Sequence, residues 1–232
     1  MDAAMRLVAK GGPSAATISG IAGMLDAPVG SIYHRFGSRD LLLARLWVRT
    51  IKRFQRGFIE ALEAGDVDQA AFGAALYNVD WTRDHLDEAK VMLLYRAEDL
   101  AEKWSEELGE ELSTLNAGVV AAIRAHATRR YGEEADAAAV RRVVFALVDV
   151  PYAAGRRHLI AGEPPPPFID DLVTETLQCV LGIEPQGRPS PRSRAPARTR
   201  PVSPAAAQAA TGPLTTGRPG QTIDAQPDDR GG

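Results

Sequence analysis

The chain has 232 residues, of which 45% are hydrophobic, so it is long enough for one small domain and a larger packed core. Charged residues interrupt its longest apolar runs, which excludes a membrane span, and no apolar run with a cleavage site opens it, so we expect no secretion signal. A single cysteine, Cys179, excludes an internal disulfide framework and a cysteine-cluster zinc site, and we expect a cytoplasmic protein.

The net charge of −3 hides an uneven distribution along the chain. Residues 1–58 carry nine Lys and Arg against three Asp and Glu, residues 59–184 carry eleven against twenty-four, and residues 185–232 carry seven against three. A basic N-terminal part joined to an acidic body indicates that the N-terminal part faces the phosphates of a nucleic acid.

The first helix that the residue pattern predicts is expected over residues 17–25. The hydroxyl of Thr17 can accept hydrogen bonds from the first backbone N–H groups of that helix, which makes it a favourable N-cap. Apolar residues then recur at helical spacing on one face. Residues 26–28 are expected to end the helix, because proline has no N–H and disfavours helical geometry in the residue before it.

Pro28 is also a favoured first residue for the next helix, which we expect to run to Phe36. Val29, Ile32 and Phe36 are expected to face inward. Polar groups are presented elsewhere on this helix by Ser31, Tyr33, His34 and Arg35. A short helix, a tight turn and an exposed polar second helix form the arrangement that enters the major groove of DNA.

The following segments show helical patterns almost throughout. Ser38 can cap a long helix over residues 39–64. Further helices are expected over residues 67–81, 84–100, 102–131, 136–161 and 168–181, the fourth of them kinked at Pro151. Hardly any segment alternates with a period of two, so no sheet is expected. From Pro185 onward, small residues, Pro and Arg dominate without a hydrophobic period, which predicts disorder.

The N-terminal quarter of the chain resembles the TetR/AcrR family of bacterial repressors. The similarity lies in T-I-x-x-I-A at residues 17–22, G-S-I-Y-H-R-F at residues 30–36 and S-R-D-L-L at residues 38–42. This string is far more specific than an isolated helix-turn-helix pattern. The family usually has Gly, Val and Ser at positions 26–28, so the turn must differ in detail. Residues 3–11 resemble the second half of the family's first helix, and we expect the natural start to lie upstream of Met1.

The resemblance implies an all-α fold. Residues 1–57 would form a three-helix DNA-binding domain with the helix-turn-helix, residues 58–184 a helical effector-binding and dimerisation domain, and residues 185–232 a disordered tail. The helices expected over residues 136–161 and 168–181 resemble the family's dimer interface, a four-helix bundle built by two subunits. A two-fold dimer presents its recognition helices to half-sites about 34–36 Å, or a multiple of it, apart.

The resemblance also implies DNA contacts by Thr17, Ala27, Pro28, Val29, Gly30, Ser31, Tyr33, His34 and Arg39. Tyr33 either reaches a phosphate with its hydroxyl or is a buried scaffold residue. Thr17 either only caps its helix or also donates to a phosphate. Arg39 stands where the family usually has a lysine that grips phosphate. The residues expected to contact the bases lie at the start of the recognition helix and are small and mostly apolar. Such residues suit contact with thymine methyl groups and recognition of DNA shape.

An effector pocket among the middle helices accepts small and often apolar molecules in this family. Six residues of this chain are candidates to line it: Phe72, Tyr77, Trp81, Met92, Tyr95 and Trp104. Each of them is otherwise an ordinary core residue. Their aromatic character favours an apolar or aromatic effector.

Two sets of cations are each open to two interpretations. A stripe on the long helix either contacts DNA or is solvated and paired between domains; it consists of Arg45, Arg49, Lys52, Arg53 and Arg56. A second set either forms a sequence-indifferent DNA arm or belongs to a dispensable tail; it consists of Arg188, Arg192, Arg194, Arg198 and Arg200.

No enzyme activity, metal site or cofactor is expected. The four histidines share no ligand-like spacing. A solvated helix face explains the carboxylates of Glu106, Glu107, Glu110 and Glu111 better than paired catalytic groups. The sequence contains no Gly-rich phosphate loop and no nucleophile elbow.

The sequence therefore predicts a ligand-responsive transcriptional regulator, a homodimeric repressor that a small molecule releases from a palindromic operator. Effector binding would tilt the long helix and spoil the spacing of the recognition helices, and operator DNA would weaken effector binding by the same factor. The alternative is an all-helical small-molecule-binding or scaffold protein whose DNA-binding unit no longer grips DNA. A steep fall of DNA affinity with salt favours the regulator.

Overall fold

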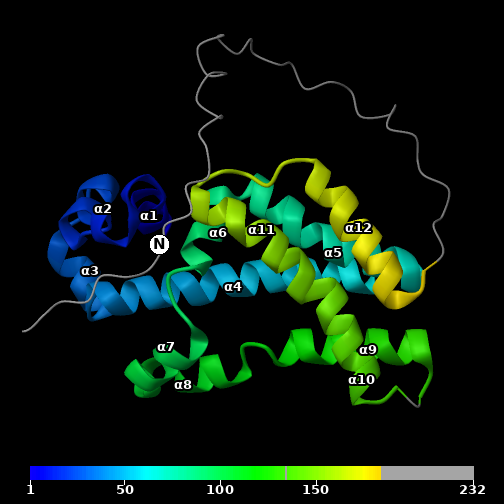
Figure 1. Cartoon of the computed structure of the whole chain (residues 1–232). Helices are drawn as coiled ribbons and strands as arrows, with labels where there is room; N and C mark the ends of the chain where they lie inside the picture. The colour runs from blue at the N-terminus through cyan, green and yellow to red at the C-terminus, as the bar shows by residue number, and fades with distance from the viewer. Residues whose placement is uncertain (134, 184–232) are drawn as a thin grey trace, which may run out of the picture. The chain divides into compact units, whose positions relative to one another are not determined.

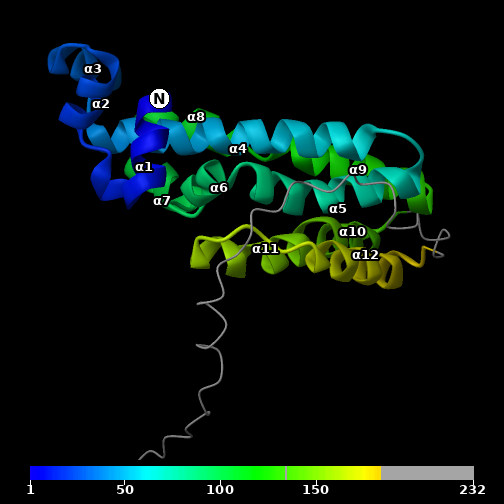
Figure 2. The same cartoon turned by 90° about the horizontal axis from the view of Figure 1, so that it is seen from above.

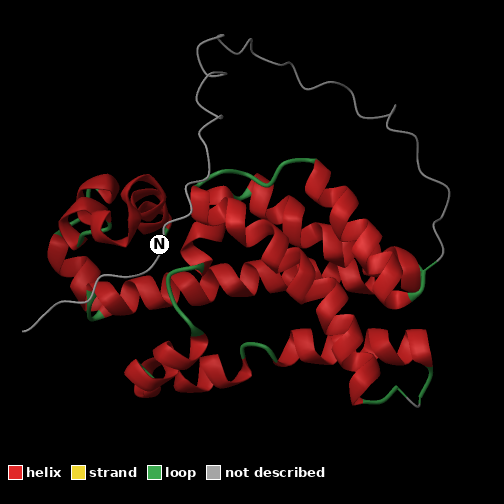
Figure 3. Ribbon diagram, in the orientation of Figure 1, coloured by secondary structure: helices red, strands yellow, loops and turns green. Residues whose placement is uncertain are grey.

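The computed structural model describes residues 1–133 and 135–183, which form helices and connecting loops without a strand (Figures 1 and 3). In chain order the helices are α1 (Asp2–Ala15), α2 (Ile18–Leu25), α3 (Val29–Phe36), α4 (Arg39–Glu63), α5 (Val67–Asp84), α6 (Leu86–Met92), α7 (Ala97–Lys103), α8 (Ser105–Thr114), α9 (Ala117–Tyr131), α10 (Ala137–Val144), the π-helical segment η1 (Phe145–Asp149), α11 (Val150–Ala161) and α12 (Phe168–Leu181). The expected all-α fold is thus confirmed. The expected disordered tail, residues 185–232, lies outside the described residues.

Within that described part of the chain, no helix combines the length and the apolar character needed to cross a lipid bilayer.

Helices α1 to α3 gather at one end of the long helix α4 (Figure 1). Their common core is apolar and includes the fully buried Ala4, Ile21 and Leu42. Helix α1 is interrupted near its end, because Gly11 and Gly12 have non-helical backbone angles. Gly12 has a φ of +73°, which glycine adopts without the steric cost that a Cβ would bring.

Helix α4 runs from the N-terminal helices along the body of the molecule (Figures 1 and 2). The Oγ of Ser38 accepts a hydrogen bond from the Leu41 N–H at 3.0 Å, which confirms the expected N-cap. The first turns of α4 bury Leu43 and Leu46 in the N-terminal core, and its last turns bury Phe58 and Leu62 in the core of the body. One rigid element therefore belongs to both cores.

Helix α5 lies between α4 and a layer that contains α11 and α12 (Figure 2). Small side chains allow this close packing, since Ala70, Ala71, Ala74 and Ala75 are almost completely buried. Near the end of α5, Arg83 donates to the Pro165 carbonyl at 3.0 Å and to the Asp170 carboxylate at 2.7 Å. These bonds attach α5 to the α11–α12 loop and to the start of α12.

Two helices that were expected to be continuous are each divided. The segment 84–100 forms α6 and α7, and the segment 102–131 forms α8 and α9. At the end of α6 the Met92 carbonyl accepts a hydrogen bond from Trp47 Nε1 at 3.1 Å. At the end of α8 the Thr114 hydroxyl donates to the Glu110 carbonyl at 3.1 Å and competes with the backbone ladder. The sequence pattern concealed this second break because the apolar residues keep their helical spacing across it.

The kink expected at Pro151 takes the form of the π-helical segment η1, which directly precedes α11. Pro151 lacks the N–H that would otherwise bond to the Leu147 carbonyl four residues earlier. The side-chain amide of Asn78 on α5 donates to that carbonyl at 3.0 Å and to the Ala74 carbonyl at 2.9 Å. A buried polar side chain therefore satisfies the acceptor that the proline leaves open.

Candidate nucleic-acid interface

The turn between α2 and α3 is held by local hydrogen bonds. The Gly20 N–H donates to Thr17 Oγ1 at 3.0 Å, so Thr17 is the N-cap of α2 as expected. Helix α2 ends at Asp26, which has a φ of +48° and is the one non-glycine residue with positive φ in the described chain. Pro28 is the N-cap of α3 with an extended backbone, one position before the helical place predicted for it. Its carbonyl accepts a hydrogen bond from Ser31 Oγ at 2.7 Å.

One face of α3 is open to solvent. Ile32 is buried and Phe36 is half-buried, but Val29 is 42% exposed, so the expectation that Val29 faces inward is wrong. Val29 stands in the first turn, ahead of the part of the helix that packs on α2 and α4. Tyr33 is 51% exposed and is therefore not a buried scaffold residue. The exposed face of α3 is formed by Val29, Gly30, Ser31, Tyr33, His34 and Arg35.

The other predicted contact residues of the turn lie beside this face. Thr17 and Pro28 are exposed and Ala27 is half-buried. The Oγ1 of Thr17 accepts a bond from the backbone and so keeps its own O–H free to donate. Eight of the nine predicted DNA contacts thus come together around α2, the turn and α3, and their contact with DNA stays a prediction.

Arg39, the ninth predicted contact, has a structural task that the sequence did not reveal. Its Nε donates to the Ala16 carbonyl at 2.8 Å, its Nη2 donates to the Pro13 carbonyl, and its Nη1 lies 3.2 Å from Asp40 Oδ1. The guanidinium therefore fastens the loop between α1 and α2 to the start of α4. The sequence feature that could have indicated this role is the Gly-Gly-Pro run at residues 11–13. It breaks the regular geometry of α1 and leaves backbone carbonyls without helical partners.

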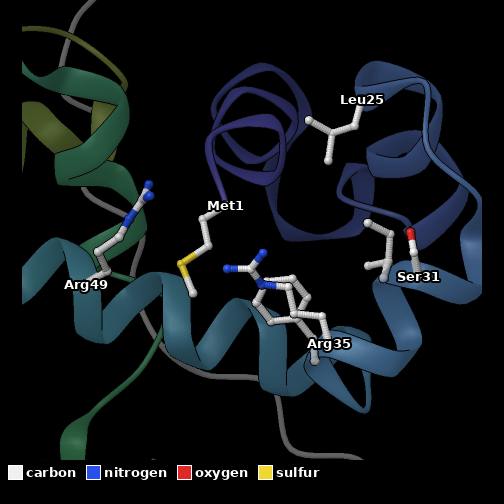
Figure 4. A pocket seen from close by; sticks show the side chains of 7 residues that line it. Met1, Leu25, Ser31, Arg35 and Arg49 are labelled. Carbon is white, nitrogen blue, oxygen red and sulfur yellow. The ribbon is translucent and has the colours of Figure 1, made fainter.

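A cleft of about 440 Å³ opens between the start of α1, the helices α2 and α3, and α4 (Figure 4). Its lining comprises Met1, Leu25, Ser31, Ile32, Arg35, Phe36 and Arg49. The guanidinium of Arg35 points from α3 toward Met1 in this view, and it also lies 5.6 Å from the centre of the Phe36 ring. Helix α3 thus carries its one arginine beside this cleft.

Carboxylates on other elements pair with three of the five cations in the α4 stripe. The Nη2 of Arg49 lies 2.7 Å from Asp2 Oδ1, and the Nζ of Lys52 lies 2.5 Å from Glu111 Oε1. The Nη1 of Arg53 pairs with Glu88 Oε1. The pairs of Lys52 and Arg53 join the predicted N-terminal domain to the helical body, as the interpretation as pairing between domains requires, whereas the pair of Arg49 lies within residues 1–57. Exposed pairs of this kind contribute only about 0–1 kcal/mol each, but they neutralise charge on this face of α4.

The six predicted effector contacts do not form one group. Tyr77, Trp81 and Met92 share a cluster with Phe54, whose ring centre lies 5.6 Å from that of Tyr77 and 5.2 Å from that of Trp81. Phe72 belongs to the core between α5 and α12, while Tyr95 and Trp104 pack on the N-terminal core. Tyr77 also packs against the core that contacts Phe72, so it links these two groups, whereas Tyr95 and Trp104 lie in a different core.

Metal-ligating groups do not cluster in the part of the chain that the structure describes, where no three His, Cys, Asp or Glu side chains are placed to hold an ion. The acidic run on α8 is exposed except for the half-buried Glu111, as a solvated face requires.

Comparisons with known proteins agree with this geometry. The family model described as "Bacterial regulatory proteins, tetR family" matches residues 1–46. The structure is similar to the crystal structure of the TetR family transcriptional regulator PfmR from Thermus thermophilus. The TM-score is 0.57 and the sequence identity is 16%, with 78% of this chain and 96% of that chain covered. The comparison with curated proteins finds no match.

The fold and the exposed second helix define the class of helix-turn-helix DNA-binding regulators. Within that class, residues 1–46 match the model of the tetR family of bacterial regulatory proteins, and the described chain has the fold of a TetR family regulator. The family resemblance of residues 17–42 is thus confirmed.

Proposed function

We propose that the protein is a homodimeric transcriptional repressor, released from a palindromic operator by a small molecule. The observation that carries the proposal is the open face of α3, which presents Tyr33, His34 and Arg35 while Ile32 fixes the helix to its core. Polar tips on a helix held this way reach phosphates and base edges in a major groove.

The basic test is binding to DNA. Fluorescence anisotropy compares a duplex from the region upstream of the protein's own gene with an unrelated duplex of equal length, at several salt concentrations. A regulator of this kind binds the upstream duplex more tightly, and its affinity falls with salt because phosphate contacts release counterions. Equal, salt-insensitive affinity for both duplexes would instead support the helical scaffold without DNA binding.

Tyr33→Phe is expected to weaken binding to every duplex by a similar factor of about three to ten, because it removes one hydroxyl that donates to a phosphate and leaves the ring in place. Titrations of both duplexes at fixed salt measure this factor. Tyr131→Phe removes an equivalent hydroxyl from α9, at a tyrosine 38% exposed and away from α3, and serves as the matched control. Unchanged affinity of Tyr33→Phe would remove Tyr33 from the phosphate contacts.

Dimerisation is supported by exposed apolar side chains on η1, α11 and α12. Five large hydrophobic residues there are about half exposed or more: Phe145, Tyr152, Ile160, Phe168 and Leu172. Isolated exposed hydrophobics are ordinary, but a concentration on one layer of the fold indicates a surface that a partner covers. A second copy of the chain would bury the same patch on both subunits around a two-fold axis.

Ile160→Asp is expected to convert the dimer to a monomer at micromolar concentration, because Ile160 is 60% exposed in the single chain and a carboxylate there would lose its hydration in the interface. Sedimentation velocity measures the change. Val120→Asp, at a 44% exposed apolar residue on α9, is the control and keeps the dimer. A dimer of undiminished stability in Ile160→Asp would place the interface elsewhere.

Ligand response is supported by the continuity of α4, whose first turns lie in the N-terminal core and whose last turns lie in the body. A ligand that shifts α4 in the body would move α3 relative to its counterpart in a dimer. Tyr77, Trp81 and Met92 remain the best-placed apolar contacts because they gather around Phe54 on α4. Tyr95 and Trp104 pack against the N-terminal core and are not part of that site, whereas Phe72 packs, as Tyr77 also does, against the adjoining core of the body.

A further inference from the structure

A groove of about 680 Å³ runs between α4 and α8, on a side of α4 that the DNA-contact proposal does not use. Its lining is Met1, Arg45, Arg49, Lys52, Arg53, Arg56, Glu107 and Glu111. A volume of this size lies in the range of pockets that hold small organic molecules, which is about 300–1,000 Å³. The groove contains five cations of α4 against two carboxylates of α8.

Two of these cations have no counter-ion. Arg49, Lys52 and Arg53 are paired with carboxylates, whereas Arg45 and Arg56 form no ion pair with any described residue. The Nε of Arg45 is buried and has no acceptor among the described residues. An anion in the groove would give both arginines the counter-ion that they lack among the described residues.

We propose that this groove binds a small organic polyanion that carries two or more phosphate or carboxylate groups. Residues 45, 49, 52 and 56 follow one another at steps of three and four, so they lie along one face of α4. Arginine binds phosphate and carboxylate groups through paired N–H donors, which suits Arg45 and Arg56 to this ligand class.

The walls of the groove favour a small ligand over the backbone of a nucleic acid. Glu107 and Glu111 on α8 face the cations across the groove, and their charges would repel a continuous row of phosphates. Arg45 is only partly exposed, so a ligand must enter the groove to reach the accessible part of its side chain. A duplex is too wide to do so.

This site suggests how an anion could act on DNA binding, a consequence that rests on the proposed function. Arg45 lies less than two turns after the start of α4, which packs against the recognition helix α3. An anion held between α4 and α8 would stabilise one position of α4, and operator binding and anion binding would then influence each other reciprocally.

The test uses the full chain and inorganic tripolyphosphate as the probe, in isothermal titration calorimetry without divalent cations and at constant ionic strength. Arg45→Gln/Arg56→Gln is expected to bind the probe at least tenfold more weakly than the wild type. Arg124→Gln/Arg141→Gln removes two exposed cations of α9 and α10 and is the charge-matched control, with unchanged affinity. Glu107→Gln is expected to tighten binding about threefold, because it removes a repulsive charge from the groove.

The outcomes separate this site from its alternatives. Equal weakening in the groove variant and the control variant would show unspecific charge attraction and would overturn the proposal. A tenfold loss of affinity for duplex DNA in Arg45→Gln/Arg56→Gln without probe would assign the groove to DNA and would also overturn it. Arg56 is exposed, so Arg56→Gln alone, with a loss of at least threefold expected, provides the test if the double variant does not fold. Because calorimetry needs no DNA, failure of the repressor proposal would leave this test intact.

Discussion

Gly57→Ala is expected to destabilise the folded chain by about 1–3 kcal/mol, although alanine is the better helix former by about 1 kcal/mol. Gly57 lies within α4, where an added Cβ would overlap the hydroxyl oxygen of Tyr77 and come within 2.7 Å of its Cε2. The ring cannot withdraw freely, since it packs against Phe54, which in turn contacts the buried Trp81 edge-on. Urea unfolding of the full chain measures the change.

The matched control for this prediction is Gly109→Ala in α8. Apart from the neighbouring residues and the backbone of α8 itself, no described atom lies within 4 Å of the position its Cβ would take, so helix propensity acts alone and stability should rise by up to about 1 kcal/mol. Tyr77→Leu in the Gly57→Ala background should recover most of the loss, because it removes the atoms that the Cβ meets. Wild-type stability of Gly57→Ala without coupling to Tyr77 would contradict the close approach of α4 and α5.

The second large effect is a loss of stability in acid that depends on His126. This residue of α9 is 1% exposed, and neither ring nitrogen has a hydrogen-bond partner among the described residues. Burial, aided by the positive charges of Arg129 and Arg130 and opposed by Asp68, lowers the pKa of His126 to about 4. The folded protein therefore holds this imidazole neutral.

Unfolding returns His126 to its ordinary pKa of about 6.5, so the unfolded chain binds a proton that the folded chain excludes. Above about pH 6.5 the titration of His126 therefore costs the folded protein nothing. As the pH falls toward 4 the free energy of unfolding decreases, and the loss is about 2–3 kcal/mol at pH 4.5. His126→Leu should lack this loss. Unfolding free energies of both proteins at pH 7.5 and 4.5, at one protein concentration, measure the difference.

Carboxylates also titrate over this range in both proteins, so only the difference between the wild type and His126→Leu reports on His126. At pH 7.5 the variant should be at least as stable as the wild type, because leucine fills a similar volume without two unpaired nitrogens. The same pH dependence in both proteins would show that His126 is hydrated or paired in the folded state.

Local sequence signals predicted the helix-turn-helix well. The caps at Thr17 and Ser38 and the ends of α2, α3, α4 and α12 were placed within one or two residues. Each of these features depends on hydrogen bonds that span at most four residues, so the sequence nearby contains the full information. The exposure of Val29 was missed because a helix of eight residues has too few positions to define its buried face.

Resemblance and periodicity do not reveal which partner a side chain meets far along the chain. The phosphate contact of Arg39 stays a prediction, and the structure adds that the donors of Arg39 engage carbonyls 23 and 26 residues earlier. Phe72 and Trp104 were both named as candidates for the effector pocket that the family resemblance implies, and the structure packs them against different cores. An inward-facing position in a helix does not specify which neighbour it will face.

The chain thus contains, in short stretches, the information for an all-α regulator with a basic N-terminal domain, because caps, turns and apolar spacing act over a few residues. The tertiary structure alone assigned Asn78 to the Leu147 carbonyl, placed Tyr77 against Gly57 and opposed Arg45 to Glu107 across a groove. Those pairings join residues 20 or more positions apart. Their formation depends on how whole helices pack, which no local pattern encodes.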